Sequence, residues 1–125
     1  PAWWMEAPAA LKSYEDDVFG GPAMITGDGR HHENLAVNYG TGGKLKGRYM
    51  ISSTWNAPLN AFLAPDEFFE GKGIDATFFG LHKANQFIGL KPLPSFMCND
   101  VIKNPTLESD IERLKAHLEK VFGRA

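Results

Sequence analysis

Apolar residues recur every three or four positions in two segments of the chain, and this spacing is typical of helices that bury one face. In the first segment the apolar positions are Leu11, Tyr14, Val18 and Phe19. They predict a helix over residues 7–19, which ends where two glycines and Pro22 follow. In the second segment the apolar positions are Leu107, Ile111, Leu114, Leu118, Val121 and Phe122. They predict an amphipathic helix that begins after the capping candidates at 104–106 and ends near Gly123.

Continuous apolar runs between turn-forming residues predict short buried strands. One run begins at Tyr49 and continues through Ile51, a second spans residues 75–81, and residues 96–98 are a third candidate. Between residues 58 and 73 the pattern indicates two short helical pieces interrupted at Pro65. Because helices and strands alternate along the chain, the expected fold class is α/β with a parallel sheet.

The predicted sheet is small for a fold of this class. Two or three parallel strands leave long unpaired edges and cannot bury two faces under two helices. We therefore expect that something that completes the sheet is absent from these 125 residues.

Residues 20–47 hold most of the glycines, and their apolar positions show almost no period. They therefore predict a long connection of a functional or mobile kind.

The overall charge and the cysteine content narrow the classes of partner. The chain carries 13 basic and 15 acidic residues, which gives a net charge of −2. This balance gives no broad attraction for nucleic acid or an anionic membrane, and it favours small ligands or protein partners. The single cysteine, Cys98, excludes an internal disulfide, and no apolar run approaches the ~20 residues of a membrane helix. We expect a cytoplasmic protein in which Cys98, within an apolar run, is buried and inert.

Several kinds of site lack the residues that they need. Residues 40–44 resemble a phosphate-binding loop, but Leu45 stands where that motif requires serine or threonine. No carboxylate or cysteine stands at ligand spacing from His31 and His32, so we expect no metal site. The sequence also contains no Gly-x-Ser-x-Gly elbow that would supply a serine nucleophile.

Aromatic residues in loops are the most informative candidates. They are Trp3, Trp4, Tyr39 and Trp55. Large rings beside strand ends form flat walls for a planar ligand, and residues 53–58 follow a predicted strand at the end where α/β proteins bind ligands. The alternative is that Trp55 only covers an edge of the core. His82 directly follows the second predicted strand, which makes it either a structural histidine or a candidate for acid/base chemistry.

A series of motifs, taken in order, resembles one known family. The motifs are PAWWMEAP, YEDDVF, YGTGGKLKG, TWNAP, HKANQF and PLPSFMCNDV. Together they resemble the NADPH:quinone reductases of the modulator of drug activity B type, which have a flavodoxin-like fold with three layers around a parallel sheet. The resemblance covers nearly the whole chain, and several motifs in order are far more specific than any one of them.

The resemblance implies an FAD cofactor and the two-electron reduction of a quinone by NADPH. It also implies that residues 1–5 lie against the isoalloxazine ring, with main-chain contacts from Ala2, Trp3, Trp4 and Met5. Ala2 replaces a glycine of the family motif, a change that costs little unless the backbone there needs a positive φ.

The resemblance further assigns the flavin site to Tyr39 and to the residues Thr54, Trp55, Asn56 and Ala57. We expect backbone N–H groups of residues 54–57 to donate to the edge of the ring that becomes negative on reduction. The catalytic residues are not identified by sequence, and Tyr39 and His82 are the candidates for acid/base participation.

The resemblance also implies that residues 1–125 are the C-terminal part of a single flavodoxin-like domain. In the family an N-terminal half precedes the double-tryptophan loop and supplies three strands, two helices and the phosphate-binding loop. A rival interpretation follows from this. The chain would then be a non-catalytic folded fragment, completed by a partner chain or by exchange with a second copy, with a homodimer as the simplest case.

Overall fold

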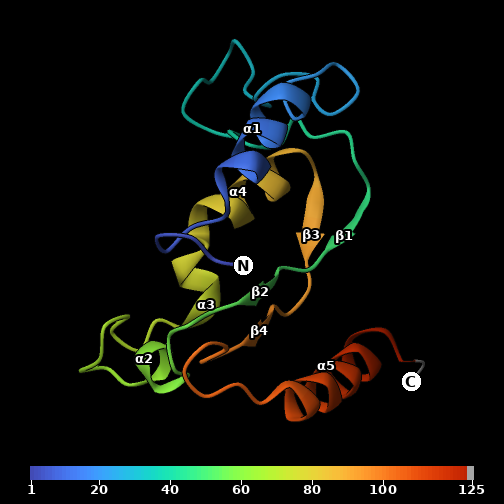
Figure 1. The fold of residues 1–125 in the computed structure, drawn as a ribbon. Helices are drawn as coiled ribbons and strands as arrows, with labels where there is room; N and C mark the ends of the chain where they lie inside the picture. Colours follow the sequence, from blue (N-terminus) through green and yellow to red (C-terminus); the bar gives the residue numbers. More distant parts are fainter. Residues whose placement is uncertain (124–125) are drawn as a thin grey trace. The chain divides into compact units, whose positions relative to one another are not determined.

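The computed structural model describes residues 1–123, which divide into two compact units with the helices and strands labelled in Figure 1. Unit 1 contains residues 1–5, 50–77 and the chain from residue 93 onward, and unit 2 contains residues 6–49 and 78–92. Both units are therefore built from segments that are far apart in sequence.

Unit 2 is built around a pair of parallel strands. Its elements are α1 (Ala9–Val18), β1 (Gly47–Tyr49), α4 (Phe79–Phe87) and β3 (Leu90–Pro92). β1 pairs with β3, with Gly47 opposite Leu90, and α4 packs against β3. The helix predicted for residues 7–19 is confirmed, because α1 differs from it only by one or two residues at each end.

The long glycine-rich connection of unit 2 folds back on itself. Ile25 and Gly43 form an antiparallel bridge, and the N–H of Lys44 donates to the carbonyl of Met24 at 2.8 Å. At Gly42 a Cβ atom would lie 2.0 Å from the carbonyl oxygen of Gly27, so only glycine permits this close approach of the backbones.

Unit 1 also contains one pair of parallel strands. Its elements are β2 (Ser52–Thr54), α2 (Asn60–Leu63), α3 (Gly73–Thr77), β4 (Phe96–Cys98) and α5 (Leu107–Phe122). β2 pairs with β4, with Thr54 opposite Cys98. Phe62 is fully buried and stacks on Phe69 with 4.1 Å between ring centroids, so aromatic side chains form the centre of the core. The strand predicted for residues 96–98 is confirmed.

The strand predicted for residues 75–81 is wrong, because these residues belong to α3 and α4. A short apolar run is compatible with a buried strand or a buried helix, and the spacing of apolar residues in 75–81 does not distinguish the two. The structure adds a signal that sequence reasoning overlooked. Gly73 has a positive φ of 71° where α3 begins, and the hydroxyl of Thr77 donates to its carbonyl at 3.0 Å.

Three smaller differences follow from local geometry. Of the run predicted as a strand, only Tyr49 lies in one, at the end of β1, and residues 50–51 lie between β1 and β2. The second helical piece expected after Pro65 is absent from the described residues, which form turns up to residue 72. β3 was not predicted because it ends in a proline, a residue that strands accept mainly at their edges or ends.

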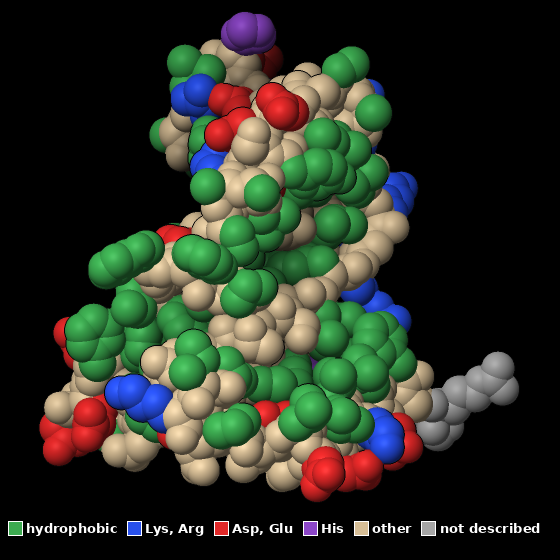
Figure 2. Space-filling model, viewed as in Figure 1, with side chains coloured by type: hydrophobic (Ala, Val, Ile, Leu, Met, Phe, Trp, Pro, Cys, Tyr) green, Lys and Arg blue, Asp and Glu red, His purple; other side chains and the backbone are tan. Residues whose placement is uncertain are grey.

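The terminal helix α5 is confirmed, but its polar side makes the specific contacts. Arg113 donates to the carbonyl of Met97 at 2.9 Å and to the buried carboxylate of Asp110 at 2.6 Å. The ring of His117 lies 3.0 Å from the carbonyl of Pro94. Leu107, Ile111 and Phe122 of the apolar stripe are exposed. In Figure 2, hydrophobic side chains lie on the surface at the lower right, where Figure 1 shows α5, and acidic side chains lie beside them.

Candidate functional site

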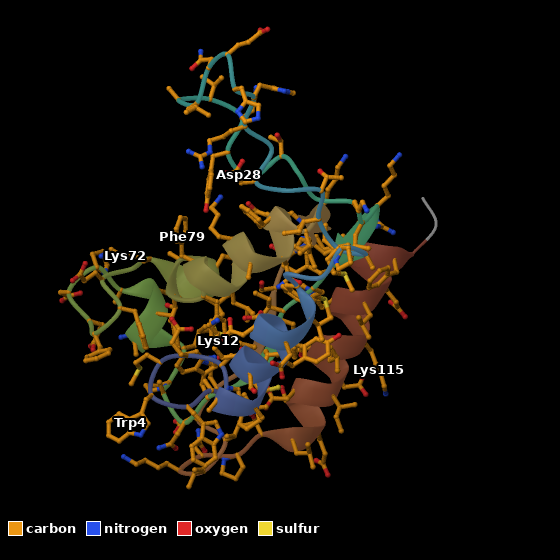
Figure 3. All side chains as sticks on the ribbon, turned by 90° about the horizontal axis from the view of Figure 1, so that it is seen from above. Trp4, Lys12, Asp28, Lys72, Phe79 and Lys115 are labelled. Carbon is orange, nitrogen blue, oxygen red and sulfur yellow. The ribbon has the colours of Figure 1, made fainter. Side chains whose placement is uncertain are left out.

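The double-tryptophan loop of unit 1 is attached to the carboxyl end of β2. The N–H of Ala2 donates to the carbonyl of Thr54 at 3.0 Å. Trp3 is exposed, and Trp4 is 92% exposed with its side chain extending outward from the loop (Figure 3). Two segments that the sequence predicted as one site, residues 2–5 and 54–57, therefore meet in the fold.

The backbone of this loop is strained at the second tryptophan. Trp4 has φ 47° and Met5 has φ 68°, so two consecutive residues with side chains occupy the left-handed region. A bulky residue rarely adopts this conformation, and each such residue costs on the order of 1–3 kcal/mol. Ala2 is not among the residues with positive φ, so alanine in place of the family's glycine meets no backbone strain there.

The turn that follows β2 is held by the segment that follows β4. The N–H of Trp55 donates to the carbonyl of Cys98 at 2.9 Å, and the N–H of Val101 donates to the carbonyl of Trp55 at 3.1 Å. The carbonyl of Ala57 accepts from the N–H of Asp100 and from the side-chain amide of Asn99, both at 3.2 Å. Four hydrogen bonds thus fix the position of this turn.

Sequence reasoning missed the structural role of Asn99 and Asp100. The signal was present, since an Asn–Asp pair directly after a predicted strand is typical of a turn whose side chains bond to nearby backbone. Asp100 has φ 56°, a conformation that Asn and Asp tolerate better than most residues. The chemistry of the candidate site therefore depends on residues that would not themselves touch a ligand.

The backbone donors of the turn are fewer than the sequence predicted. The N–H of Trp55 already donates to the carbonyl of Cys98. Within residues 1–123, the N–H groups of Asn56 and Ala57 donate to no protein acceptor. Asn56 is exposed and Ala57 is half-buried, so these two donors are available to a ligand.

The expectation that Trp55 forms a flat wall is wrong. Its side chain is 5% exposed and packs edge-on against Phe62 and Phe69, with ring centroids 5.0 and 5.8 Å away. Its Nε1–H donates to the hydroxyl of Ser53 at 2.9 Å. The alternative interpretation, a tryptophan that covers the core, is the one observed. A loop position in sequence does not decide whether a ring turns outward or inward.

Tyr39 and His82 belong to unit 2. The ring of Tyr39 is exposed on one side, and its centroid lies 5.4 Å from that of Phe87 and 5.7 Å from the guanidinium of Arg30. His82 does not follow a strand, because it lies within α4. It is buried, and its Nδ1 lies 2.7 Å from the hydroxyl of Tyr49. The positional argument for acid/base chemistry at His82 therefore fails.

The surroundings of Cys98 disfavour the reactive form of its thiol. Burial raises the pKa of the Cys98 thiol, and the neighbouring carboxylate of Asp110 raises it further, so the thiolate form is disfavoured. Within residues 1–123, no three or more His, Cys, Asp or Glu side chains form a group suited to hold a metal ion. No helix in this part of the chain has the length and apolar character to cross a membrane.

Comparison with known proteins places the chain in a family. The family described as having a flavodoxin-like fold matches residues 1–121. The chain is 49% identical over 126 residues to the NADPH:quinone oxidoreductase MdaB of Haemophilus influenzae, which covers 98% of this chain and 66% of that protein. It is 52% identical over 128 residues to an uncharacterized protein of Schizosaccharomyces pombe, which covers 100% of this chain and 65% of that protein.

The chain thus spans about two thirds of the length of the curated relatives that it matches. The α/β architecture with parallel strand pairs agrees with the fold of the matched family. The chain therefore belongs to the family of proteins with a flavodoxin-like fold, and its resemblance within that family to the NADPH:quinone reductases of the modulator of drug activity B type is confirmed.

Proposed function

We propose that this chain supplies the flavin-ring-binding part of an FAD-dependent enzyme that reduces quinones with NADPH. The observation that carries the proposal is the hydrogen bond from Ala2 to Thr54, which joins the double-tryptophan loop to the carboxyl end of β2. Ligands of open α/β sheets bind at such strand ends. The name of the Haemophilus relative supports the choice of NADPH and a quinone as the reactants.

The described residues fit a flat ring system. Trp3 and Trp4 are exposed, and the backbone of Trp4 and Met5 has a left-handed conformation that a relaxed loop would rarely adopt. The turn at 55–57 is fixed by four hydrogen bonds and leaves two N–H donors available. FAD, when bound, would supply the chemistry of accepting a hydride from NADPH and passing it to the quinone.

Each residue of the site then has a defined task. The rings of Trp3 and Trp4 would cover the flavin and exclude water, while the main chain of Ala2 and Met5 would follow its edge. The N–H groups of Asn56 and Ala57 would donate to the ring edge that becomes negative on reduction, and a fixed donor stabilises that charge without reorganisation.

Thr54 and Trp55 would act from within the fold. The carbonyl of Thr54 holds Ala2, and the buried indole of Trp55 anchors the turn to the core. Tyr39 is proposed as a further flavin contact on the strength of the resemblance alone. A homodimeric, cytoplasmic protein remains our prediction for the assembled enzyme.

The exposed ring of Trp4 provides the test. We expect Trp4→Ala to weaken FAD binding by about tenfold or more, because a lost aromatic wall removes contact area and stacking worth roughly 1.4 kcal/mol or more. Affinity is measured from the change in flavin fluorescence on titration with the purified protein. The free energy of unfolding should change little, since Trp4 is 92% exposed.

Phe68→Ala is the matched control, because Phe68 is an exposed aromatic residue of the same unit outside the site. This variant should bind FAD as tightly as the wild type. Equal affinity in the wild type and Trp4→Ala, or an equal loss in both variants, would rule out the proposed role of the loop.

A second function is favoured by a separate observation. Each sheet has only two strands in the described residues, and Leu107, Ile111 and Phe122 of the apolar stripe of α5 are exposed. These features suit a non-catalytic folded fragment that is completed by a partner chain or a second copy. Purified protein that is yellow and oxidises NADPH with a quinone supports the enzyme, and colourless protein of dimeric or larger mass supports the fragment.

A further inference from the structure

Unit 2 contains a cavity whose lining shares only Tyr39 with the proposed flavin contacts. Its volume is about 890 Å³, and it lies between α1 and α4. The apolar part of its lining includes Phe19, Ile25, Leu81, Ala84, Phe87 and Ile88. Volume and lining are both typical of sites that bury a small organic molecule.

One acidic side chain of this cavity has no partner. Glu15 lines the cavity and is 9% exposed, and its Oε1 atom is buried without a hydrogen-bond partner. Lys12 stands one helical turn away on α1, but its ammonium group pairs with Asp16. Burying a carboxylate without a hydrogen-bond donor costs free energy, so a donor on a bound ligand would stabilise Glu15.

The charge of the lining selects the kind of donor. Three acidic side chains line the cavity, Glu6, Glu15 and Asp16, against the one basic side chain of Lys12. Because Lys12 and Asp16 pair with each other, the excess negative charge lies on the other two. A cation is therefore favoured over a neutral or anionic ligand.

The aromatic lining selects the body of the ligand. Tyr39 and Phe87 both line the cavity, with ring centroids 5.4 Å apart, and Phe19 lines it as well. Aromatic faces attract cations and pack against other rings. A ligand with a ring and a charged amine would pack against the aromatic side chains and donate a hydrogen bond to the carboxylate of Glu15.

We propose that this cavity of unit 2 binds a small organic ammonium ion with an apolar or aromatic body, whose N–H group donates to the carboxylate of Glu15. Glu15 supplies the charge, and the rings of Phe19, Tyr39 and Phe87 hold the apolar body. The inference goes beyond the proposed quinone reduction and is tested on flavin-free protein, so failure of either leaves the other standing.

The test compares two probes that differ in charge. 1-Naphthylmethylamine is a cation at neutral pH, and 1-naphthylmethanol has the same ring without the charge. Isothermal titration calorimetry on flavin-free protein should show the amine binding about tenfold or more tightly than the alcohol, since a hydrogen bond to a charged group contributes more than a neutral one. Glu15→Gln should reduce this preference to within about threefold.

Two further variants control the result. Asp17→Asn removes an exposed carboxylate from the same helix that does not line the cavity, and it should keep the preference for the amine. Ala84→Phe fills the cavity without changing its charge and should abolish binding of both probes, with the circular dichroism spectrum showing that the helices persist. Equal binding of the two probes to the wild type, no saturable binding, or an undiminished preference in Glu15→Gln would overturn the proposal.

Discussion

In the absence of a bound cation, burial of Glu15 disfavours the charged form of its carboxyl group. Burial raises the pKa of its carboxyl group, the nearby Lys12 lowers it, and Asp16 and Glu6 raise it further. The folded protein therefore holds this proton more tightly than the unfolded chain does. The stabilisation is fully present below the unfolded value and is lost as the pH rises through the raised folded value.

Glu15→Gln should remove this pH dependence. We expect the variant to be more stable than the wild type at pH 7, because it buries a neutral amide in place of a charge, and the difference should shrink as the pH falls toward 4. Free energies of unfolding in urea at several pH values measure this. Asp17→Asn serves as the exposed control and should show no such trend. A wild type that gains stability relative to Glu15→Gln as the pH rises would contradict the assignment.

Single residues also show where chemical reasoning from sequence succeeded. Cys98 was expected to be a buried, inert thiol; it is only half-buried, although its surroundings do raise the pKa of the thiol. Ala2 was expected to be tolerated unless its φ is positive, and it is not among the residues with positive φ. The backbone angle of Ala2 is a local property, whereas the pKa of Cys98 is raised by burial and by Asp110 of α5. The surroundings of His82 also come from another segment, β1, 33 residues away along the chain.

At the scale of elements, the short helix α2 shows how strongly one side chain secures the core of unit 1. Phe62 is 0% exposed, stacks on Phe69 and meets the edge of Trp55. We expect Phe62→Ala to cost about 3–5 kcal/mol of the free energy of unfolding, through lost contacts and the cavity left behind. Urea denaturation followed by tryptophan fluorescence gives this value, because Trp55 reports on the same cluster.

Leu63→Ala is the neighbouring control for this measurement. Leu63 lies on the same helix and is exposed, so its loss should cost less than about 1 kcal/mol. Similar costs for the two substitutions would mean that the aromatic cluster does not secure the fold in solution.

Elements with a clear helical period were predicted well, and short apolar runs were not. α1 and α5 are 10 and 16 residues long, and apolar residues recur at helical spacing along them, so a strand is a poor alternative. Residues 75–81 offered one short run, and the choice between strand and helix depended on what packs around them. β3 has only three residues and ends in Pro92, and its pairing with β1 is not visible from either segment alone.

At the scale of the whole molecule, the exposed stripe of α5 predicts self-association. Leu107, Ile111 and Phe122 are exposed, whereas Arg113 and His117 fasten the helix to the chain around β4. Apolar patches of this kind are typical of protein interfaces. We expect the wild type to form dimers or larger species at micromolar concentration and Leu107→Lys to shift the mass toward the monomer, as measured by light scattering after size-exclusion chromatography.

Ser109→Lys adds the same charge to the exposed surface of the same helix without touching the apolar stripe, and it should leave the mass unchanged. A monomeric wild type, or an equal shift in both variants, would show that the stripe does not mediate association. Leu107→Lys should unfold no more readily than the wild type, because the replaced side chain is exposed.

The sequence by itself determined the α/β class, the two long helices and the family, since helical period and ordered motifs are properties of the chain that survive without contacts. It also identified residues 2–5 and 54–57 as parts of one candidate site. Only the tertiary structure decided that Ala2 bonds to Thr54, that Trp55 turns into the core, and that Asn99 and Asp100 hold the turn. The direction of a side chain and the hydrogen-bond partners of the backbone depend on which distant segments come into contact. A local pattern of residues does not specify those contacts.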